Sequence, residues 1–413
     1  MKRVVITGLG AICPIGNNAA ETWAAAIAGK CGIEPIRGFE DEVLPIHVAG
    51  QVKNFDPIAA GLTAQEIRHY DLFCQYAVAA SLEAMQQSGL VSGENIAPER
   101  LGVYLGSGIG GLQTFVAQTK NYLDRGAKGV SPLFIPMLIA NMGGGNTAIR
   151  LNAQGPNLTS VAACATSTNT IGEAFLAIQA GRADAIVAGG AEAAIHPLAI
   201  GGFANARALS TVEDPAMACL PFDSRRKGFV MAEGAGVMVL EEMEHAIARG
   251  AHIIAEVCGY GHTCDAHHYT APRPDGTVTA RCIREALDQA GYRNGETLYI
   301  NAHGTGTAMN DSAETKAIKI ALGEDEARRA LISSTKSMTG HMLGAAGGLE
   351  LVLTAMAVEK GIVPPTIGLT EPDPACDLYY TPLHAEEHKI DIAISNSLGF
   401  GGHNATVAIR PIR

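Results

Sequence analysis

The sequence predicts an α/β protein built from two similar halves, and three observations support that fold class. Apolar strands that are continuous rather than alternating recur along the chain, as is typical of strands buried on both faces. Each strand is followed by a glycine-containing loop and then by a segment with helical periodicity. This order ends near residue 251 and starts again at Ile253, so we expect two packed halves, 1–251 and 252–413, without strong sequence identity between them.

The first half opens with an apolar segment. Val4–Thr7 predicts a buried strand, and the glycines of Gly8–Gly16 predict a turn directly after it. The polar segment Arg207–Gly228 is interpreted as a structured surface connection. Further strands are expected at 103–107, 185–190 and 237–242, and helices at 19–28, 73–87, 132–150 and 166–180.

The second half repeats the pattern and places polar residues after its strands. Strands are expected at 298–302, 332–334, 392–396 and 407–410, and helices at 313–322 and 344–358. The first of these strands leads into the loop His303–Thr307, and the third leads into the loop Gly399–Asn404. Glycines in both loops would let a ligand approach the backbone closely.

Composition and charge argue against several classes of protein. The formal net charge of −11 argues against nucleic acid as the main partner. The nine cysteines form no CxxC pair, which indicates reduced thiols in a cytoplasmic protein. The N-terminal apolar run is interrupted at Gly8 and Gly10, unlike a signal peptide. The most apolar long stretch, 185–206, contains Glu192, His196 and five glycines or prolines, so it does not predict a membrane span.

An apolar run over 160–163 ends at Cys164, and a helix is expected behind it. One face of that helix carries Ile171, Ala174, Phe175 and Ile178. Cys164 is therefore expected at a strand-to-helix turn, at the positive end of a helix, where a thiol pKa is lowered and backbone N–H groups are free. A nucleophile needs the first feature and an oxyanion needs the second. A buried structural cysteine is the alternative that this stretch leaves open.

Two histidines lie beside glycine-rich loops. His303 follows a buried strand, and it is either part of a site or an ordinary hydrogen-bonded loop residue. His341 precedes a small-residue helix start, where its pKa would fall and the imidazole would stay neutral. Lys336 and Glu350 flank this turn and are able to pair with each other. The spacing of the two histidines and Cys164 fits no standard zinc pattern, so no metal is expected.

Four segments together resemble the β-ketoacyl-acyl carrier protein synthases, and within that family the class II (KAS II) condensing enzymes. They are the Cys164 turn and the ranges 301–307, 336–347 and 396–402, and the resemblance extends from Val4 to Val407. It implies a thiolase-like fold, which is a duplicated five-layer α-β-α-β-α sandwich, and a homodimer. It also implies decarboxylative condensation of acyl-acyl carrier protein with malonyl-acyl carrier protein in type II fatty-acid elongation. The products would be 3-oxoacyl-acyl carrier protein, CO2 and free carrier protein, and no cofactor would be required.

The resemblance implies catalytic roles for matching residues. Cys164 would be the nucleophile, and His303 and His341 would stabilise the enolate formed by decarboxylation. Lys336 would support the site electrostatically, with Glu350 as its partner. The backbone N–H groups of Cys164 and Phe400 would form the oxyanion hole.

Further roles follow from the same resemblance. Thr305 and Thr307 would contact the phosphopantetheine arm, Thr270 would lie in a mobile loop 265–270, Phe400 would act as a gate, and Ile109 would lie at the acyl pocket. Arg68, His69 and Arg207 stand at the positions that dock the acidic carrier protein. Gln65 and His69 are less basic than the lysines usual there, so the docking patch is expected to be weaker or to extend to Arg125 and Lys128.

Three other functions are alternatives to fatty-acid elongation. A ketosynthase of a polyketide or another specialised acyl pathway would use the same chemistry, and the glycine at Gly306, where many relatives have serine, is shared with polyketide synthases. A non-catalytic chain-length factor is disfavoured because Cys164, His303 and His341 are all retained. A degradative thiolase is disfavoured because the range 396–404 contains no second cysteine.

Overall fold

The structure of the protein is a computed structural model, and it describes residues 1–412. Within these residues the main strands form one ten-stranded sheet in the order β10-β9-β13-β14-β8-β1-β7-β6-β4-β5. The strands are β1 (Val4–Ile12), β4 (Leu101–Gly106), β5 (Asn157–Leu158), β6 (Ala185–Glu192), β7 (Gly234–Glu242), β8 (Ala255–Cys264), β9 (Leu298–Asn301), β10 (Leu331–Ser333), β13 (Ile392–Gly399) and β14 (His403–Arg410). Two short pairs lie outside this sheet: β2 (Glu34–Pro35) with β3 (Val48–Ala49), and β11 (Ile362–Val363) with β12 (Glu386–Glu387).

The strand order shows a structural duplication. From β5 to β1 the pairings are parallel, parallel, antiparallel and antiparallel, and from β10 to β8 they follow the same sequence. The two sections join edge to edge where Val4–Ile6 of β1 pairs antiparallel with Ala255–Val257 of β8. The sheet thus consists of two sections with the same order of pairings, and the join between their edges is a feature that the sequence did not predict.

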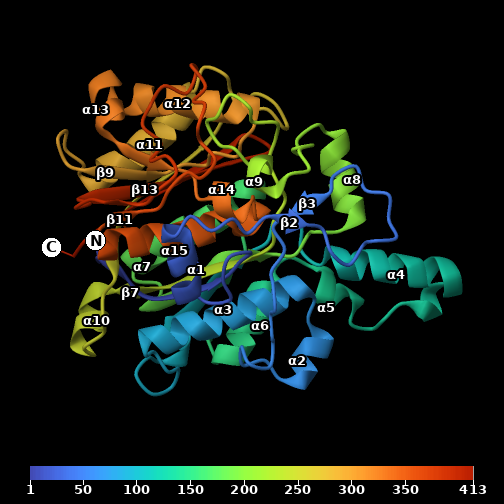
Figure 1. Ribbon diagram of the computed structural model, residues 1–413. Coiled ribbons are helices and arrows are strands. Elements are labelled where there is room, and N and C mark those ends of the chain that lie inside the picture. The colour runs from blue at the N-terminus through green and yellow to red at the C-terminus, as the bar shows by residue number, and fades with distance from the viewer. Residues whose placement is uncertain (413) are drawn as a thin grey trace.

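Helices cover both sections of the sheet and fill the space between them (Figure 1). In the first half they are α1 (Ala19–Ile27), α2 (Ala64–His69), α3 (Leu72–Ser88), α4 (Leu112–Arg125), α5 (Phe134–Leu138), α6 (Met142–Leu151), α7 (Thr166–Gln179), α8 (Pro197–Asn205), α9 (Pro215–Ala218) and α10 (Met243–Ala248). In the second half they are α11 (Thr277–Ala290), α12 (Ala308–Leu322), α13 (Glu324–Arg329), α14 (Lys336–Thr339) and α15 (Ala346–Lys360).

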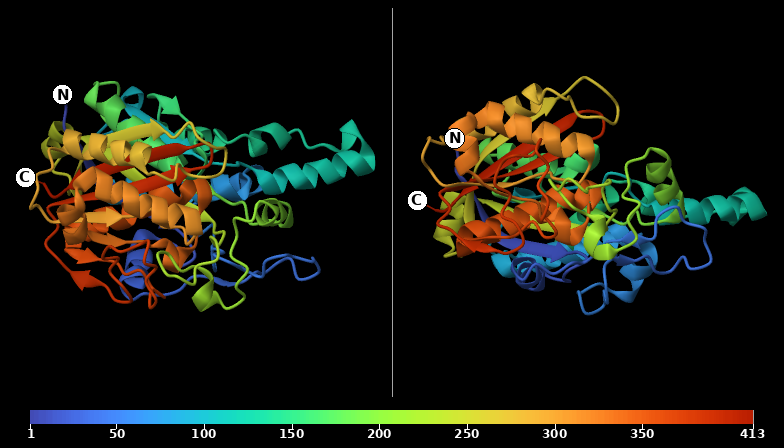
Figure 2. Two further views of the ribbon diagram at one scale, coloured as in Figure 1. Left: turned by 90° about the horizontal axis from the view of Figure 1, so that it is seen from above. Right: turned by 45° about the horizontal axis from the view of Figure 1, so that its top comes forward.

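The described helices and strands form five layers, as the resemblance implied. Helices α3 and α6 pack on the outer face of the first-half strands, and α11, with α12 packed beside it, covers the second-half strands. Helices α7 and α15 each contact strands of both sections, so they form the middle layer. Figure 2 shows α4 extending from this body on the side away from both termini.

The middle helices cross at very short range. A Cβ atom on Gly347 of α15 would lie 1.9 Å from Thr168 Oγ1 of α7, so no larger residue fits at this position. The Gly348 N–H donates a hydrogen bond to Ser167 Oγ at 2.8 Å. The two halves are therefore in direct contact through the layer that they share.

The turn predicted over Gly8–Gly16 is wrong in its first part, because β1 continues through Gly8 and Gly10 to Ile12. The chain turns only at 13–16, where Cys13 and Gly16 exchange backbone hydrogen bonds. A Cβ atom on Gly8 would lie 2.0 Å from the Ala84 carbonyl oxygen of α3, and one on Gly10 would lie 1.9 Å from that of Ala80. These glycines let a helix approach the strand rather than reverse the chain.

In the second half, glycines of a strand again let a helix approach closely. A Cβ atom on Gly259 or Gly261 of β8 would lie 2.0 Å from a carbonyl oxygen of α11, that of Ala286 or Cys282 respectively. Strands β1 and β8 occupy equivalent places in the two sections, so the paired glycines are part of the duplication.

Two other local predictions need correction. The helix expected over 132–150 is divided into α5 and α6, because the chain is extended at Ile139 between them. The connection 207–228 is not wholly on the surface: Phe222 and Asp223 are fully buried, and the Phe222 ring stacks on Tyr380 with centroids 3.8 Å apart. Among residues 1–412 no helix is long and apolar enough to cross a membrane.

Candidate active site

Cys164 lies in a short 3₁₀ turn, Ala163–Ala165, directly before α7. The residue before it, Ala163, has a φ of +49°, which an L-residue adopts only under strain. The turn packs against Gly399 at the end of β13, where a Cβ atom would lie 2.6 Å from the Ala162 carbonyl oxygen. The predicted position at the start of a helix is therefore observed, and a strand of the second half supports it from behind. The strand expected to lead directly into Cys164 is not formed, because β5 ends at Leu158.

Backbone N–H groups of two segments surround the sulfur. The Phe400 N–H donates a hydrogen bond to the Cys164 thiol. Within residues 1–412 the N–H of Cys164 itself has no hydrogen-bond acceptor. Two donors from different halves of the chain are thus available next to one thiol.

The expected lowering of the Cys164 pKa is wrong. Burial raises the pKa of the thiol to about 12, although the charge of Lys336 and the Phe400 N–H act in the opposite direction. The carboxylates of Glu192 and Glu350 add to the increase. The free thiol is therefore protonated near neutral pH, and a base is required to produce the thiolate.

The two histidines face each other across the same pocket. His303 follows β9 and His341 follows α14, and their exposed fractions are 3% and 2%. The ring centroids are 5.3 Å apart in an edge-to-face arrangement. Burial lowers the pKa of both imidazoles well below the usual value of 6.5, with Lys336 contributing to each shift. Both rings are thus neutral near pH 7, and the main cause is burial rather than the helix start that we expected near His341.

Lys336 and Glu350 form a buried ion pair beside the histidines. The side chains are 1% and 3% exposed, and Nζ of Lys336 pairs with Oε1 of Glu350. The same Nζ lies 3.4 Å from Nδ1 of His303. Among the described residues, Nδ1 of His341 has no hydrogen-bond partner, so it is an unsatisfied polar atom in the wall of the site.

The loop that carries His303 is held by a carboxylate that the sequence analysis missed. Oε1 of Glu314 accepts a hydrogen bond from the His303 N–H at 2.8 Å, and Oε2 accepts one from the Gly304 N–H at 2.9 Å. Burial raises the pKa of Glu314 to about 7. A carboxylate within a helix gives no sequence signal for such a role, because its partners are two backbone groups, eleven and ten residues earlier, and the distant side chain of Asn396.

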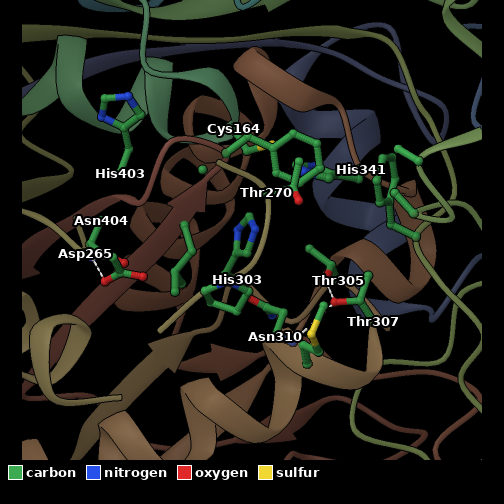
Figure 3. Close-up of a pocket in the computed structure, with 18 of the residues that line it drawn as sticks. Cys164, Asp265, Thr270, His303, Thr305, Thr307, Asn310, His341, His403 and Asn404 are labelled. Atoms are coloured by element: carbon green, nitrogen blue, oxygen red, sulfur yellow. Dashed lines mark hydrogen bonds between the residues drawn. The ribbon is translucent and has the colours of Figure 1, made fainter. Parts of the chain in front are cut away.

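Cys164, His303 and His341 line one pocket of about 140 Å³ (Figure 3). Its lining includes Cys164, Arg207, Phe229, Asp265, Thr270, His303, Thr305, Thr307, Asn310, His341, Phe400, His403 and Asn404. The hydroxyls of Thr305 and Thr307 are 3.0 Å apart. The three groups expected to do the chemistry thus come together, although they are separated by 139 and 38 residues in the chain.

Three of the residues expected at the site lie elsewhere. Ile109 does not line this pocket and is 38% exposed. Arg68 and His69 end α2 and also do not line it. Figure 1 shows α2 on the lower side of the molecule and α8, which precedes Arg207, at the upper right.

Two loops meet at the mouth of the pocket. The Gly401 N–H donates to the Tyr269 carbonyl at 2.8 Å, and the Asp265 N–H donates to the Gly402 carbonyl at 2.8 Å. The Asn404 side chain donates to Asp265 Oδ1 at 2.8 Å. The glycine loop after β13 and the loop 265–270 are therefore hydrogen-bonded to each other in this conformation.

The second half contains a backbone copy of the Cys164 turn. Leu343 has a φ of +49°, as Ala163 does, and the 3₁₀ turn Leu343–Ala345 leads directly into α15. Gly344 stands where Cys164 stands in the first half. Its N–H donates to Oε2 of Glu192 at 3.0 Å. In this copy the backbone donor is therefore occupied by an oxygen of the protein itself.

Family models match both halves of the chain. The model described as "Beta-ketoacyl synthase, N-terminal domain" matches residues 1–246, and "Beta-ketoacyl synthase, C-terminal domain" matches residues 254–370. The chain belongs to the β-ketoacyl synthase family. The family prediction is therefore confirmed.

Individual relatives of this β-ketoacyl synthase agree with the family models. The chain is 49% identical over 409 residues to 3-oxoacyl-[acyl-carrier-protein] synthase 2 of Staphylococcus aureus, covering 99% of this chain and 98% of the relative. It superposes on a β-ketoacyl synthase of Burkholderia phymatum with a TM-score of 0.92 and 34% identity, covering all of both chains. It superposes equally completely, with a TM-score of 0.89 and 34% identity, on a type II polyketide ketosynthase solved in complex with its acyl carrier protein. The thiolase-like fold class is thereby confirmed.

The arrangement in this β-ketoacyl synthase supports acyl transfer to sulfur. It combines a thiol, two backbone donors beside it and two neutral imidazoles in one pocket. Among residues 1–412, groups of three or more histidine, cysteine or acidic residues that could hold a metal ion are absent.

Proposed function

We propose that the protein catalyses decarboxylative Claisen condensation of an acyl-acyl carrier protein with malonyl-acyl carrier protein in type II fatty-acid chain elongation. The products are 3-oxoacyl-acyl carrier protein, CO2 and free carrier protein. The observation that carries this proposal is the meeting of Cys164 with His303 and His341 in one pocket. The identity of 49% to a 3-oxoacyl-[acyl-carrier-protein] synthase 2 supports it, whereas the polyketide ketosynthase is 34% identical.

The first half-reaction transfers the acyl chain to the enzyme. A neutral imidazole of the pocket takes the thiol proton of Cys164, and the thiolate attacks the thioester carbonyl. The N–H groups of Cys164 and Phe400 stabilise the oxyanion that forms. Collapse of this intermediate releases the phosphopantetheine thiolate, which takes up the proton, and leaves the acyl chain on Cys164.

The second half-reaction forms the carbon–carbon bond. The malonyl carboxylate leaves as CO2, and its electron pair becomes a thioester enolate. N–H groups of the neutral rings of His303 and His341 donate to the enolate oxygen, where the negative charge develops. The enolate carbon attacks the acyl carbonyl on Cys164, and the Cys164 thiolate leaves and is reprotonated.

Lys336 keeps the two imidazoles in the required state. Its charge opposes protonation of either ring, and Glu350 holds the ammonium group in place. Glu350 therefore acts through Lys336 and not on the substrate.

The Gly344 turn supports the proposed oxyanion hole. It has the same backbone form as the Cys164 turn, and its N–H binds a carboxylate oxygen at 3.0 Å. A turn of this shape is thus able to hold a negatively charged oxygen, and at Cys164 the equivalent N–H is left for the substrate.

The proposed partners are acyl carrier protein and a second copy of the chain. Arg207 at the pocket mouth offers a positive charge to an acidic carrier, with Thr305, Thr307 and Thr270 contacting its phosphopantetheine arm. Arg68 and His69 extend the docking surface, and Phe400 gates the pocket. Ile109 bounds the end of the acyl chain beyond the 140 Å³ pocket.

For the homodimer, we propose a contact surface made of the edge strand β5 and the exposed apolar side chains of α4 and α5. Both residues of β5 are exposed, as are the apolar side chains of Phe115, Tyr122, Leu123 and Ile135. We also propose a cytoplasmic location and a division between the halves at residues 251 and 252. The gap between the two family models, from 246 to 254, supports that division.

Intact-protein mass spectrometry tests the function directly. The purified protein is incubated with acyl carrier thioesters of increasing chain length, and a single acyl mass should appear on Cys164. Addition of malonyl-acyl carrier protein should then remove that mass and produce 3-oxoacyl-acyl carrier protein. Loading restricted to polyketide or other specialised acyl groups would favour the alternative pathway, and no loading of any chain would contradict the proposal.

A further inference from the structure

Glu192, the last residue of β6, is a fully buried carboxylate that the proposed reaction does not use. Its partners in the described structure are all donors. Oε1 accepts from Ser107 Oγ at 2.7 Å and from the Ile109 N–H at 3.1 Å, and Oε2 accepts from the Gly108 N–H at 2.8 Å and from the Gly344 N–H at 3.0 Å. A site that offers only donors matches an ionised carboxylate, which only accepts, and these hydrogen bonds oppose the increase in the pKa of Glu192 that burial causes.

The donors come from two segments that are far apart in sequence. One is the acyl-side loop, defined here as 107–111 between β4 and α4. The other is the histidine-side turn, defined as 341–345, in which Gly344 follows His341 by three residues. Glu192 is therefore the point at which a loop of the first half is fixed to the turn of the second half that carries a histidine of the site.

The same carboxylate lies close behind the nucleophile. A Cβ atom on Gly108 would lie 2.8 Å from Glu192 Oε2, 3.5 Å from the Gly344 nitrogen and 3.6 Å from the Ala163 carbonyl oxygen. The acyl-side loop is thus packed between Glu192, the histidine-side turn and the residue that precedes Cys164. Glu192 itself does not line the pocket.

We propose that Glu192 is a positioning residue that locks the acyl-side loop and the histidine-side turn together, and thereby fixes His341 relative to Cys164. This inference rests on the proposed function, because it assigns a residue to that same reaction. A displacement of about 1 Å between reacting groups can lower a rate about 100-fold, so a lock between these segments has a direct effect on turnover.

Replacing the carboxylate by an amide breaks the lock with little change of shape. In Glu192→Gln the amide NH2 group is a donor and cannot accept from the N–H or O–H groups that face it. Whichever of the two oxygen positions the NH2 group occupies, the two hydrogen bonds accepted at that position are lost. The buried donors that made them remain unpaired. Glu192→Asp keeps two acceptor oxygens, although it is shorter by one methylene group.

A matched control lies on the neighbouring strand. Glu241 of β7 is also fully buried. In the β6–β7 register it lies opposite Ala185, whereas Glu192 lies opposite Gly234 at the other end of the two strands. Glu241 accepts a hydrogen bond from Thr7 and pairs with Arg249. Glu241→Gln therefore lowers stability through loss of a buried carboxylate without touching either segment of the site.

The test compares steady-state condensation by wild type, Glu192→Gln, Glu192→Asp and Glu241→Gln at a temperature at which circular dichroism shows all four folded. For Glu192→Gln we expect kcat to fall about 10- to 100-fold, while KM for the carrier-bound substrates stays at the wild-type value. Glu192→Asp should recover part of the loss, and Glu241→Gln should keep the wild-type kcat despite a lower Tm. Cys164 of Glu192→Gln should also be alkylated faster by iodoacetamide at a given pH, because a nearby negative charge is gone.

A wild-type kcat for Glu192→Gln, an equal loss in Glu241→Gln, or no recovery in Glu192→Asp would each overturn the positioning role. If Glu192→Gln does not fold, Ser107→Ala decides: it removes one donor, and a wild-type kcat in that variant would overturn the inference. Absence of condensation by the wild type would instead contradict the proposed function, and this inference with it.

Discussion

Replacing Lys336 by methionine should separate its electrostatic role from its packing role. The change keeps most of the length of the side chain and removes its charge, so Glu350 is left as a buried carboxylate without a partner. Breaking a buried ion pair in this way costs about 3–5 kcal/mol. We therefore expect a lower free energy of unfolding in urea, and the double variant Lys336→Met/Glu350→Gln should recover most of the loss because neither charge remains.

The same substitution should change the pH dependence of decarboxylation. At 3.4 Å and an effective dielectric constant of about 20, repulsion between Lys336 and a protonated His303 is about 5 kcal/mol, and Glu350 offsets part of it. Removing Lys336 therefore raises the pKa of both imidazoles from their lowered values, although burial, the larger cause, still acts on them. Because the neutral rings are the active form, activity will be lost at a higher pH as the solution is acidified.

The assay is release of CO2 from malonyl-acyl carrier protein between pH 5 and pH 9, for wild type and Lys336→Met. The acid limb of the variant should lie at least about one pH unit above that of the wild type, a difference equal to about 1.4 kcal/mol. An acid limb at the same pH in both proteins would refute the argument that Lys336 keeps His303 and His341 neutral.

Four further predictions concern the nucleophile, its support and the carrier. Because the pKa of Cys164 is about 12, alkylation of the wild-type thiol by iodoacetamide should accelerate about tenfold per pH unit from pH 7 to 10, and a plateau near pH 7 would contradict it. Cys164→Ala should abolish condensation but retain CO2 release, which mass spectrometry and CO2 trapping will separate. Gly399→Ala should place a methyl group 2.6 Å from the Ala162 carbonyl oxygen, destabilise the protein by about 1–3 kcal/mol and slow acyl loading. Arg207→Glu should raise KM for carrier-bound substrates, most strongly at low salt, and leave kcat unchanged.

The sequence was most informative where chemistry and backbone shape coincide. Cys164, His303 and His341 each follow an apolar strand or precede a small-residue helix, so their places at strand and helix ends were predictable. The ion pair of Lys336 with Glu350 was predictable because the two residues flank one turn. That all of them line one pocket followed from the family resemblance and not from their spacing.

Features that depend on three-dimensional contacts could not be predicted in this way. Gly8 and Gly10 look like turn residues until the carbonyl groups of α3 are placed against them. Glu192 and Glu314 bind backbone N–H groups, which are invisible in a sequence. The pKa of Cys164 was predicted in the wrong direction, because the loss of hydration on burial outweighs the effect of the helix terminus.

The close crossing of α7 and α15 constrains how this molecule can accommodate a long or bulky chain. Because Thr168 of α7 and Gly347 of α15 are in contact, the half that carries Cys164 cannot slide along the half that carries the two histidines. Opening of the pocket entrance must then come from movement of the hydrogen-bonded loops at Asp265 and Gly402 rather than of the core. A chimera that joins halves from two relatives will consequently keep the distance between its cysteine and its histidines only if the small residues on both sides of that crossing come from the same relative.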